Sequence, residues 1–559
     1  MIKFFKNRFV KIFTVVALLF AGSISVAYTD EYFEISRNMD IFTTLFRELN
    51  IYYVDDTKPG DLMKKGIDSM LESLDPYTNY IPESEVEDYR FMTTGQYGGI
   101  GALIGQKKDY VVITDPYEGF PAHKADLRAG DVVIKINDKE LKGLRYNEVS
   151  KLLKGQPKTS VKITIQRPGV DEPIVKEVIR DEIKINSVSY SGMLNDEVGY
   201  IRLTGFTDKA SHEVKEALLE LKSNKNAKSL ILDLRGNPGG LLNEAVNITN
   251  IFVDKGTEVV TTKGKVKEWD KAYKALNSPI DTEIPVVVLV NSGSASASEI
   301  VSGSIQDLDR GIVIGQKTFG KGLVQTTRPL SYNAQLKVTT AKYYIPSGRC
   351  IQALDYANRN EDGSVGKVPD SLISVFKTSK GRLVYDGGGI EPDFTTDQSK
   401  LSNIARSLIT KQLIFDFATN YRMENETIAV AKDFKLTENE YEQFVSFLSD
   451  KEYDYTTKSE QNLEDLMESA EKENYFDAIK DEYEALMKKM KHDKKEDLVK
   501  NKKEIMQLLE MEIASRYYFQ NGRIEAAFDF DKDINKAIEA LQDPEVFTSI
   551  MNRNVDEKQ

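Results

Sequence analysis

Hydrophobic positions recur at helical spacing near both ends of the chain and at strand spacing between them. Residues 31–90 carry apolar side chains about four residues apart, and from residue 401 the chain is charged, poor in glycine and similarly spaced. Such stripes predict amphipathic helices in both regions. The positions are Ile41, Leu45, Leu49, Leu62, Ile67 and Leu71, then Leu463, Leu466, Ala470, Phe476, Ile479, Tyr483, Leu486, Met490, Ile505, Leu508, Leu509 and Ile513.

The middle of the chain has two different patterns of hydrophobic positions. Glycine-punctuated alternating runs (YVVITDP, DVVIKIND, SVKITIQR) predict short strands between residues 95 and 168, with one helix near 146–153. From residue 183 to 393, β-branched runs such as SLILDL and PVVVLV alternate with helical stretches, which is typical of buried strands in an α/β domain. The predicted fold class is multidomain α+β, with boundaries at 28–90, 91–182, 183–400 and 401–559.

Residues 1–27 form a separate element. Four basic residues and no acid precede an apolar run that starts at Ile12, and the small residues Ser25-Val26-Ala27 follow it. This order predicts a secretory signal peptide. An uncleaved signal anchor is the alternative, because an apolar run of about 16 residues is just short of a membrane span. Either outcome exports the chain, and the anchor would associate it with the membrane.

Composition narrows the chemistry. The 559 residues include 75 Lys and Arg against 88 Asp and Glu, so the net charge is −13, which argues against a nucleic-acid binder. A single cysteine, Cys350, excludes an intramolecular disulfide and any multi-cysteine metal cluster. Three scattered histidines argue against a multi-histidine metal site and leave few candidates for a histidine-based triad.

A glycine-rich loop opens the strand-rich segment. Tyr97-Gly98-Gly99-Ile100-Gly101-Ala102 precedes an apolar strand. Successive backbone N–H groups in such a loop can hold a carboxylate, and the strand beside it can pair with an extended peptide. A plain tight turn explains the glycines equally well.

Serines and a lysine follow two buried strands of the α/β region. The sequence NSGSASASEI comes directly after PVVVLV, and Lys321 lies in TFGKGLVQ after the strand GIVIG. A strand that leads into a helix can expose a hydroxyl next to helix N–H groups, and a desolvated lysine can accept its proton. The alternative is structural, because Ser296 and Glu299 also fit a helix capping box. The residues alone leave Ser294, Ser296 and Ser298 nearly tied.

Several long motifs, in order along residues 41–393, resemble the C-terminal processing peptidases, the tail-specific serine proteases of peptidase family S41. The motifs are LDPYTNY, LDLRGNPGG, NSGSASASEI, QDLDRGIVIGQKTFGKGLVQ, YYIPSGRCIQ and GIEPD. Residues 95–180, including the turn PAHKADLRAGD, resemble a PDZ domain. The resemblance implies a crotonase-like α/β serine protease core with an inserted PDZ domain, acting without a metal or cofactor.

The resemblance also assigns roles by motif position. It makes Ser296 the nucleophile, Lys321 the general base and Gln325 the residue that orients the lysine. The supporting positions would be Glu299, Thr318 and Asp307, with Asp307 acting on geometry rather than on proton transfer. The oxyanion hole would use the N–H of Ala297 and of Gly239 or Gly240, and the PDZ loop Gly99, Ile100 and Gly101 would receive a peptide carboxylate.

The function expected on this basis is an exported serine endopeptidase, in a bacterial periplasm, that recognises apolar C-terminal tails of proteins or peptides. A catalytically silent PDZ scaffold that holds such tails is the alternative. Residues 401–559 are expected to form a helical domain that packs on itself or on the protease. Their alternative role is dimerisation or the docking of an adaptor. Cys350 is expected to be a small buried residue.

Overall fold

The computed structural model describes residues 32–397, 400–490 and 494–551, so residues 1–27 lie outside it. The chain divides into two compact units, Met1–Tyr80 and Ile81–Gln559. The described part of the first unit contains a helix over residues 32–52 and α2 (Pro59–Glu72), which confirms the predicted helices. Within the described ranges, no helix combines the length and apolar character needed to cross a membrane.

Residues 102–179 form a small domain around one antiparallel sheet in the order β3-β4-β5-β7-β8. The buried residues of β7 are Val161, Ile163 and Ile165, so alternate side chains enter the core as predicted. Strand β3 pairs only with β4 along this path and is therefore an edge strand. The elements are β3 (Ala102–Lys107), β4 (Tyr110–Pro116), α4 (Pro121–Lys124), β5 (Val132–Ile136), β6 (Lys139–Glu140), α5 (Tyr146–Leu153), β7 (Ser160–Gln166) and β8 (Ile174–Ile179).

The short strands β2 (Gln96–Gly99) and β9 (Asp181–Lys184) pair antiparallel at the entrance and exit of this domain. Strand β2 follows α3 (Val86–Thr94), which ends at Gly95 with a left-handed φ of 67°, and β9 follows β8. The strand-rich domain is therefore an insertion, whose two connections to the rest of the chain lie side by side.

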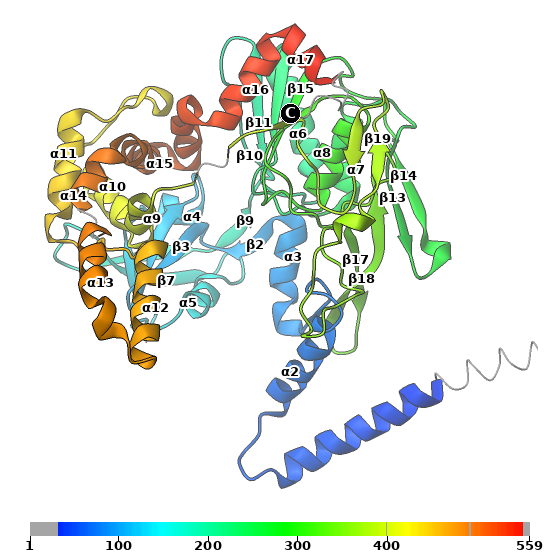
Figure 1. Cartoon of the computed structure of the whole chain (residues 1–559), viewed down its shortest axis with the longest axis horizontal. Coiled ribbons are helices and arrows are strands. Elements are labelled where there is room, and N and C mark those ends of the chain that lie inside the picture. The colour runs from blue at the N-terminus through cyan, green and yellow to red at the C-terminus, as the bar shows by residue number, and fades with distance from the viewer. Residues whose placement is uncertain (1–31, 398–399, 491–493, 552–559) are drawn as a thin grey trace, which may run out of the picture. The chain divides into compact units, whose positions relative to one another are not determined.

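The second unit contains a six-stranded sheet in the order β10-β11-β12-β15-β16-β21, parallel from β11 onward. Its strands β10, β11 and β15 are labelled in Figure 1. One face packs on α6, α7 and α8, and the other face packs on α16. Both faces are covered, which explains why β12 and β15 are buried along their whole length. Bounds are β10 (Val188–Met193), β11 (Val198–Leu203), α6 (Ala210–Ser223), β12 (Ser229–Asp233), α7 (Leu242–Asn250), β15 (Val286–Val290), α8 (Ala297–Asp307), β16 (Ile312–Gly315) and β21 (Phe394–Thr395).

A second sheet lies beside this core. Strand β18 (Gln335–Tyr344) pairs antiparallel with both β17 (Leu323–Pro329) and β13 (Glu258–Gly264), and β13 also pairs with β14 (Lys271–Lys274). The hairpin of β17 and β18 begins two residues after Lys321. A small hairpin, β19 (Val375–Lys377) and β20 (Leu383–Tyr385), follows.

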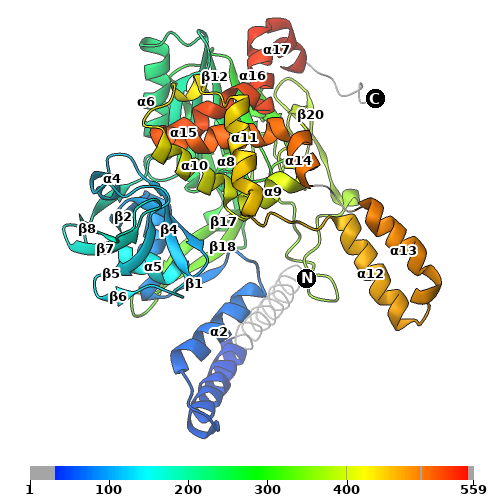
Figure 2. The same cartoon turned by 90° about the vertical axis from the view of Figure 1, so that its left-hand side faces the viewer.

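The C-terminal region is helical, as predicted. An apolar cluster that includes Phe417, Phe444 and Leu509 joins α10, α11 and α15, while α12 and α13 form a hairpin (Figure 2). Helix α15 is kinked at Tyr518 and Phe519, where Phe519 has a φ of 53°. The helices are α9 (Asn403–Thr410), α10 (Leu413–Glu424), α11 (Glu438–Phe447), α12 (Lys458–Lys472), α13 (Phe476–Met490), α14 (Lys494–Lys500), α15 (Lys502–Ala527), α16 (Lys532–Gln542) and α17 (Pro544–Met551).

Candidate active site

The serine turn, residues 291–298, follows β15 and contains four serines, of which Ser292 is exposed. The structure also separates the three candidates Ser294, Ser296 and Ser298. Ser294 is fully buried and its hydroxyl donates to the carbonyl of Leu234 at 2.8 Å. Ser298 is also fully buried and donates to the carbonyl of Asn237 at 2.9 Å. Ser296 is half-buried at the N-terminus of α8, with φ 55° and ψ −112°. Left-handed φ values are rare and strained for non-glycine residues, so the surrounding structure must hold this turn.

A buried carboxylate joins the serine turn to the lysine loop, residues 316–322. Oε2 of Glu299 accepts from the backbone N–H of Ser296 at 2.8 Å and from that of Lys321 at 2.9 Å. Oε1 accepts from the hydroxyl of Thr318 at 2.6 Å and from the N–H of Gly320 at 2.7 Å. Burial raises the pKa of Glu299, and the four donors oppose that shift. The family resemblance gave Glu299 a supporting role. In the structure its carboxylate accepts from the main chain of both the serine turn and the lysine loop.

Further contacts fix the lysine loop. The N–H of Phe319 donates to the carbonyl of Ser294 at 3.0 Å, and Thr318 Oγ1 accepts from the N–H of Ile390 at 2.6 Å. Gln325 lies in β17, where its side-chain amide donates to Thr339 Oγ1 at 3.1 Å. The predicted orienting residue is thus held in the hairpin that directly follows the loop.

The glycine loop, residues 234–240, lies against the serine turn. A Cβ placed on Gly239 would lie 2.8 Å from the nitrogen of Ala297 and 2.7 Å from the carbonyl oxygen of Ala295. Gly239 has a φ of 97°, and its N–H donates to Asn237 Oδ1 at 2.9 Å. The carbonyl of Gly239 accepts from the N–H of Phe206 at 3.2 Å. Since the peptide is trans, the N–H of Gly240 points away from Phe206.

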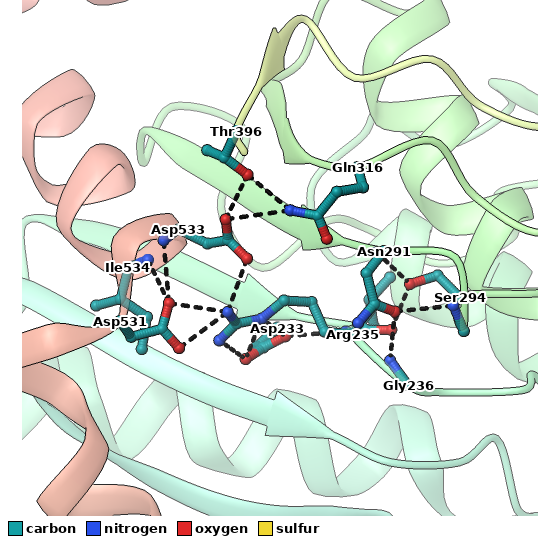
Figure 3. A network of polar contacts seen from close by, with 12 residues as sticks. Asp233, Arg235, Gly236, Asn291, Ser294, Gln316, Thr396, Asp531, Asp533 and Ile534 are labelled. Carbon is teal, nitrogen blue, oxygen red and sulfur yellow. Dashed lines mark hydrogen bonds and ion pairs between the residues drawn. The ribbon is translucent and has the colours of Figure 1, made fainter. Parts of the chain in front are cut away.

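Arg235 ties the glycine loop to α16 (Figure 3). Its guanidinium donates to Asp233, Asp531 and Asp533, at 2.9 Å for each of the last two. On its other side the loop is held by the N–H of Gly236, which donates to Asn291 Oδ1 at 2.9 Å.

Two residues near the site carry roles that the sequence did not assign. The hydroxyl of Tyr343 donates to the carbonyl of Ser296 at 3.2 Å, and its burial raises its pKa well above the usual range. Asn237 is fully buried, accepts from Gly239, and donates through Nδ2 to the carbonyl of Leu203 at 2.8 Å. Both residues stand in the quoted motifs, but the contacts of Tyr343 with Ser296 and of Asn237 with Leu203 are long-range and have no local signal.

Asp307 lies away from the serine turn. It is at the last position of α8, roughly 16 Å along the helix from Ser296 at 1.5 Å per residue. Its carboxylate accepts from Arg349 at 2.8 Å and from the N–H of Ser347 at 3.0 Å, and all three residues belong to the core region. These contacts agree with the expectation that Asp307 acts on geometry rather than on proton transfer.

Cys350 is half-buried rather than buried as expected. Burial raises the pKa of its thiol, which disfavours the nucleophilic thiolate. Among the residues that the structure describes, no group of three or more His, Cys, Asp or Glu side chains could hold a metal ion.

In the small domain, the loop at Ile100 and Gly101 turns its carbonyls inward. The carbonyl of Ile100 accepts from Ala122 N–H at 2.7 Å, and that of Gly101 accepts from Tyr117 N–H at 3.0 Å. Because these peptides are trans, the N–H groups of Gly101 and Ala102 point to the opposite side. Gly101 has a φ of 73°, and a Cβ there would lie 2.6 Å from Phe120 Cβ. Gly99 precedes the loop and pairs with Asp181.

Comparison with known proteins places the chain. Family models match at residues 197–357 (Peptidase family S41), 112–167 (PDZ domain) and 404–541 (Probable PDZ-protease, C-terminal helical domain). A carboxy-terminal-processing protease of Bartonella bacilliformis is 38% identical over 316 residues, which cover 56% of this chain and 72% of that protein. The chain belongs to the carboxy-terminal-processing proteases of family S41.

Two further similar proteins also bear protease names. A probable CtpA-like serine protease of Staphylococcus aureus (strain MSSA476) is 36% identical over 394 residues, covering 70% of this chain and 74% of that protein. A solved photosystem II D1 C-terminal processing protease is 29% identical and covers 64% of this chain and 87% of its own, with a TM-score of 0.35. This carboxy-terminal-processing protease is therefore a serine protease with a PDZ domain and a C-terminal helical domain, and the expected multidomain α+β fold class is confirmed.

Proposed function

We propose that this protease cleaves peptide bonds with Ser296 as nucleophile and Lys321 as general base. The observation that carries the proposal is the state of the serine turn. Ser294 and Ser298 are fully buried and bonded to carbonyls, whereas Ser296 is half-buried on a strained turn. Glu299 holds the main chain of Ser296 and of Lys321 on the same carboxylate oxygen.

The reaction follows from these two groups. Ser296 Oγ attacks the carbonyl carbon while its proton passes to the neutral amine of Lys321. The C–N bond then breaks, and Lys321 returns the proton to the departing amine, which leaves an acyl-enzyme ester. Water attacks the ester by the same route, its proton passes through Lys321 to Ser296, and the free enzyme is restored.

The developing oxyanion requires N–H donors beside Ser296. The N–H of Ala297, in the first turn of α8, is one candidate. We assign the second donor to Gly240 rather than Gly239, because the N–H of Gly239 donates to Asn237 while that of Gly240 points away from Phe206. Gln325 would orient Lys321, and Thr318 would keep Glu299 in place.

Substrate capture would use the PDZ domain. The N–H groups at Gly101 and Ala102 would bind a terminal carboxylate, and the edge of β3 would pair with the tail. The partly buried Ala102 and Ile104 of β3 pack on the apolar core that includes Val149 and Leu153 of α5, which suits an apolar tail. The substrates would be exported proteins, and we place the enzyme in a bacterial periplasm on the predicted signal segment.

The test is cleavage of an unstructured protein with an apolar C-terminal tail. Ser296→Ala and Lys321→Ala should each abolish cleavage while circular dichroism stays unchanged. Ser292→Ala is the matched control, because Ser292 is exposed in the same turn and should keep full activity. Cleavage by Ser296→Ala and Lys321→Ala at the wild-type rate would contradict the dyad. Tail binding without cleavage by the wild type would favour the scaffold alternative.

The PDZ role is tested separately with the same substrate. Amidation of its C-terminal carboxylate removes the charge that the loop at Gly101 would bind, so KM should rise at least tenfold with little change in kcat. Equal kinetics for both substrates would contradict capture of the tail by its carboxylate.

A further inference from the structure

Arg235 in the glycine loop is held by carboxylates from a distant part of the chain. Asp531 and Asp533, at the N-terminus of α16, each accept from the same guanidinium nitrogen at 2.9 Å (Figure 3). The other two nitrogens donate to Asp233, the last residue of β12, at 2.7 to 3.1 Å. The side chain of Arg235 is 16% exposed, so these contacts are nearly buried.

We propose that Asp531 and Asp533 are positioning residues of the protease reaction. They orient Arg235 and, through its main chain, place the glycine loop beside the N–H of Ala297. The proposal rests on the proposed function, because it concerns the donors that would bind the oxyanion. It gives the C-terminal helical domain a role in the chemistry.

The glycine loop needs such external support. Its tip is Gly239 and Gly240, which have φ of 97° and 153° and no side chains to hold them. One support comes from the serine turn, where Asn237 O accepts from the N–H of Ala295 at 3.0 Å and from Ser298. Gly236 and Gly239 add main-chain contacts to Asn291 and Phe206. Arg235 is a further support, and the α16 carboxylates fix where its guanidinium lies.

Helix α16 also has apolar contacts that dock it on the sheet, apart from the charges at this site. Ile534, Ala537 and Ala540 already pack on the sheet face formed by residues such as Ile231 and Val287. Three carboxylates around one guanidinium leave a net negative charge in a nearly buried place, and desolvation makes such groups a poor source of stability. The geometry of these contacts is more specific than their charge, because three carboxylate partners fix the orientation of the Arg235 guanidinium.

Asp533 also contacts the other loops of the site. Thr396, next to β21, donates to it at 2.5 Å, and Gln316 lies 3.5 Å away through its side-chain amide. Gln316 is the first residue of the lysine loop. The N-terminus of α16 therefore meets the carboxyl ends of β12, β16 and β21, where the glycine and lysine loops begin.

The experiment compares the full-length wild type with Asp531→Asn/Asp533→Asn. Asp531 is the N-cap of α16 and accepts from the N–H groups of Asp533 and Ile534. Asparagine is an equally good N-cap, so the double variant removes the charges and leaves the helix capped. Glu539→Gln is the matched control, because Glu539 pairs with Lys536 on the same helix and is exposed.

We expect kcat to fall at least tenfold with KM within about twofold, because a displaced donor affects the transition state more than the bound substrate. Affinity for a peptidyl boronate, which forms a tetrahedral adduct with serine, should fall in parallel with kcat. Affinity of the Ser296→Ala background for an uncleaved peptide of the same sequence should stay unchanged. Arg235→Lys should behave like the double variant, since it keeps the charge but loses the planar fork.

A double variant with wild-type kcat and boronate affinity would overturn the proposal, even if its melting temperature falls. The proposed function is judged separately, from cleavage by the wild type and its loss in Ser296→Ala. If the double variant does not fold, Asp533→Asn alone leaves the N-cap intact and carries the same expectations.

Discussion

At the scale of single residues, Glu299 is the contact on which the two halves of the candidate dyad depend. Each of its oxygens accepts two donors, so a glutamine in its place must turn its NH2 group toward two of them. The carboxylate therefore fixes the distance between the serine turn and the lysine loop.

Glu299→Gln should lower kcat by about 10²-fold, the size expected when reacting groups move by about 1 Å. It should also lower the free energy of unfolding by about 2–3 kcal/mol, because buried donors lose their acceptors. Steady-state kinetics and denaturant unfolding measure the two effects. Glu391→Gln, at an exposed ion pair with Lys317, is the control that should change neither. Wild-type kinetics in Glu299→Gln would show that the bridge is dispensable.

Asp126, in the turn after α4, gives a pH-dependent test in the PDZ domain. Burial raises its pKa, but hydrogen bonds from Arg128, Arg167 and Lys176 outweigh burial and lower the pKa to about 2. Because the pKa of Asp126 is lower in the folded state, its ionised carboxylate stabilises the fold at pH values above about 3.8, the pKa in the unfolded chain. This stabilisation is lost as the pH falls through about 2.

Asp126→Asn should therefore lower the unfolding midpoint at pH 7 and differ less from the wild type at pH 3. Asparagine suits the left-handed φ of 56°, so the backbone is not strained by the change. Thermal unfolding at the two pH values measures the difference, with Asp109→Asn in an exposed hairpin turn as control. A difference that grows as the pH falls would contradict the assigned direction.

At the scale of elements, the candidate site forms where β12, β15 and β16 end and their loops meet. The glycine loop touches the serine turn so closely that a side chain at Gly239 has no room, whereas Gly236 in the same loop has nothing within 4 Å of its Cβ position. Both glycines have positive φ, of 97° and 69°, so they share the backbone cost of substitution and differ in the collision.

Gly239→Ala should lower kcat by at least 10²-fold, comparable to the loss of an oxyanion donor. Gly236→Ala should cost about 1 kcal/mol of stability from backbone strain and keep most of the activity. Peptide cleavage and chemical unfolding of both variants make the comparison. Equal activity losses would mean that strain, not the contact with the serine turn, decides the effect.

At the scale of the whole molecule, the C-terminal helices have unequal importance. Helix α16 covers the face of the core sheet that includes Ile231, Val287 and Ile312. In contrast, the hairpin of α12 and α13 buries little of its surface, and Leu463 and Ala470 are the buried residues of α12.

Removal of residues 400–559 should leave the protease core insoluble. Each apolar side chain of the sheet that the removal exposes loses about 1.5–3 kcal/mol of burial free energy. Replacement of residues 458–493 by a short Gly-Ser linker should give a folded and active enzyme. Size-exclusion chromatography and the cleavage assay distinguish the two. A soluble, active core without residues 400–559 would contradict the structural role of α16, while the adaptor alternative for the helices stays a prediction.

Much of the fold follows from local pattern. The strands at 229–233, 286–290 and 312–315, the helix at 146–153 and the helical C-terminus lie where hydrophobic spacing predicts them. Spacing depends only on near neighbours, which explains why it predicts elements but not their partners. Nothing in the sequence of α16 indicates that it covers strands such as β12, β15 and β16, whose residues lie more than 200 positions earlier.

By itself, the sequence determined the element types, the family and the motif positions of Ser296, Lys321, Glu299 and the glycines, because these are carried by short contiguous stretches. The tertiary structure alone decided which of the candidates Ser294, Ser296 and Ser298 is accessible, since burial of Ser294 and Ser298 depends on carbonyls some 60 residues away. It also decided the partner of Arg235, because Asp533 lies 298 residues further along the chain. Contacts between such distant residues depend on how the domains pack, and no local pattern encodes them.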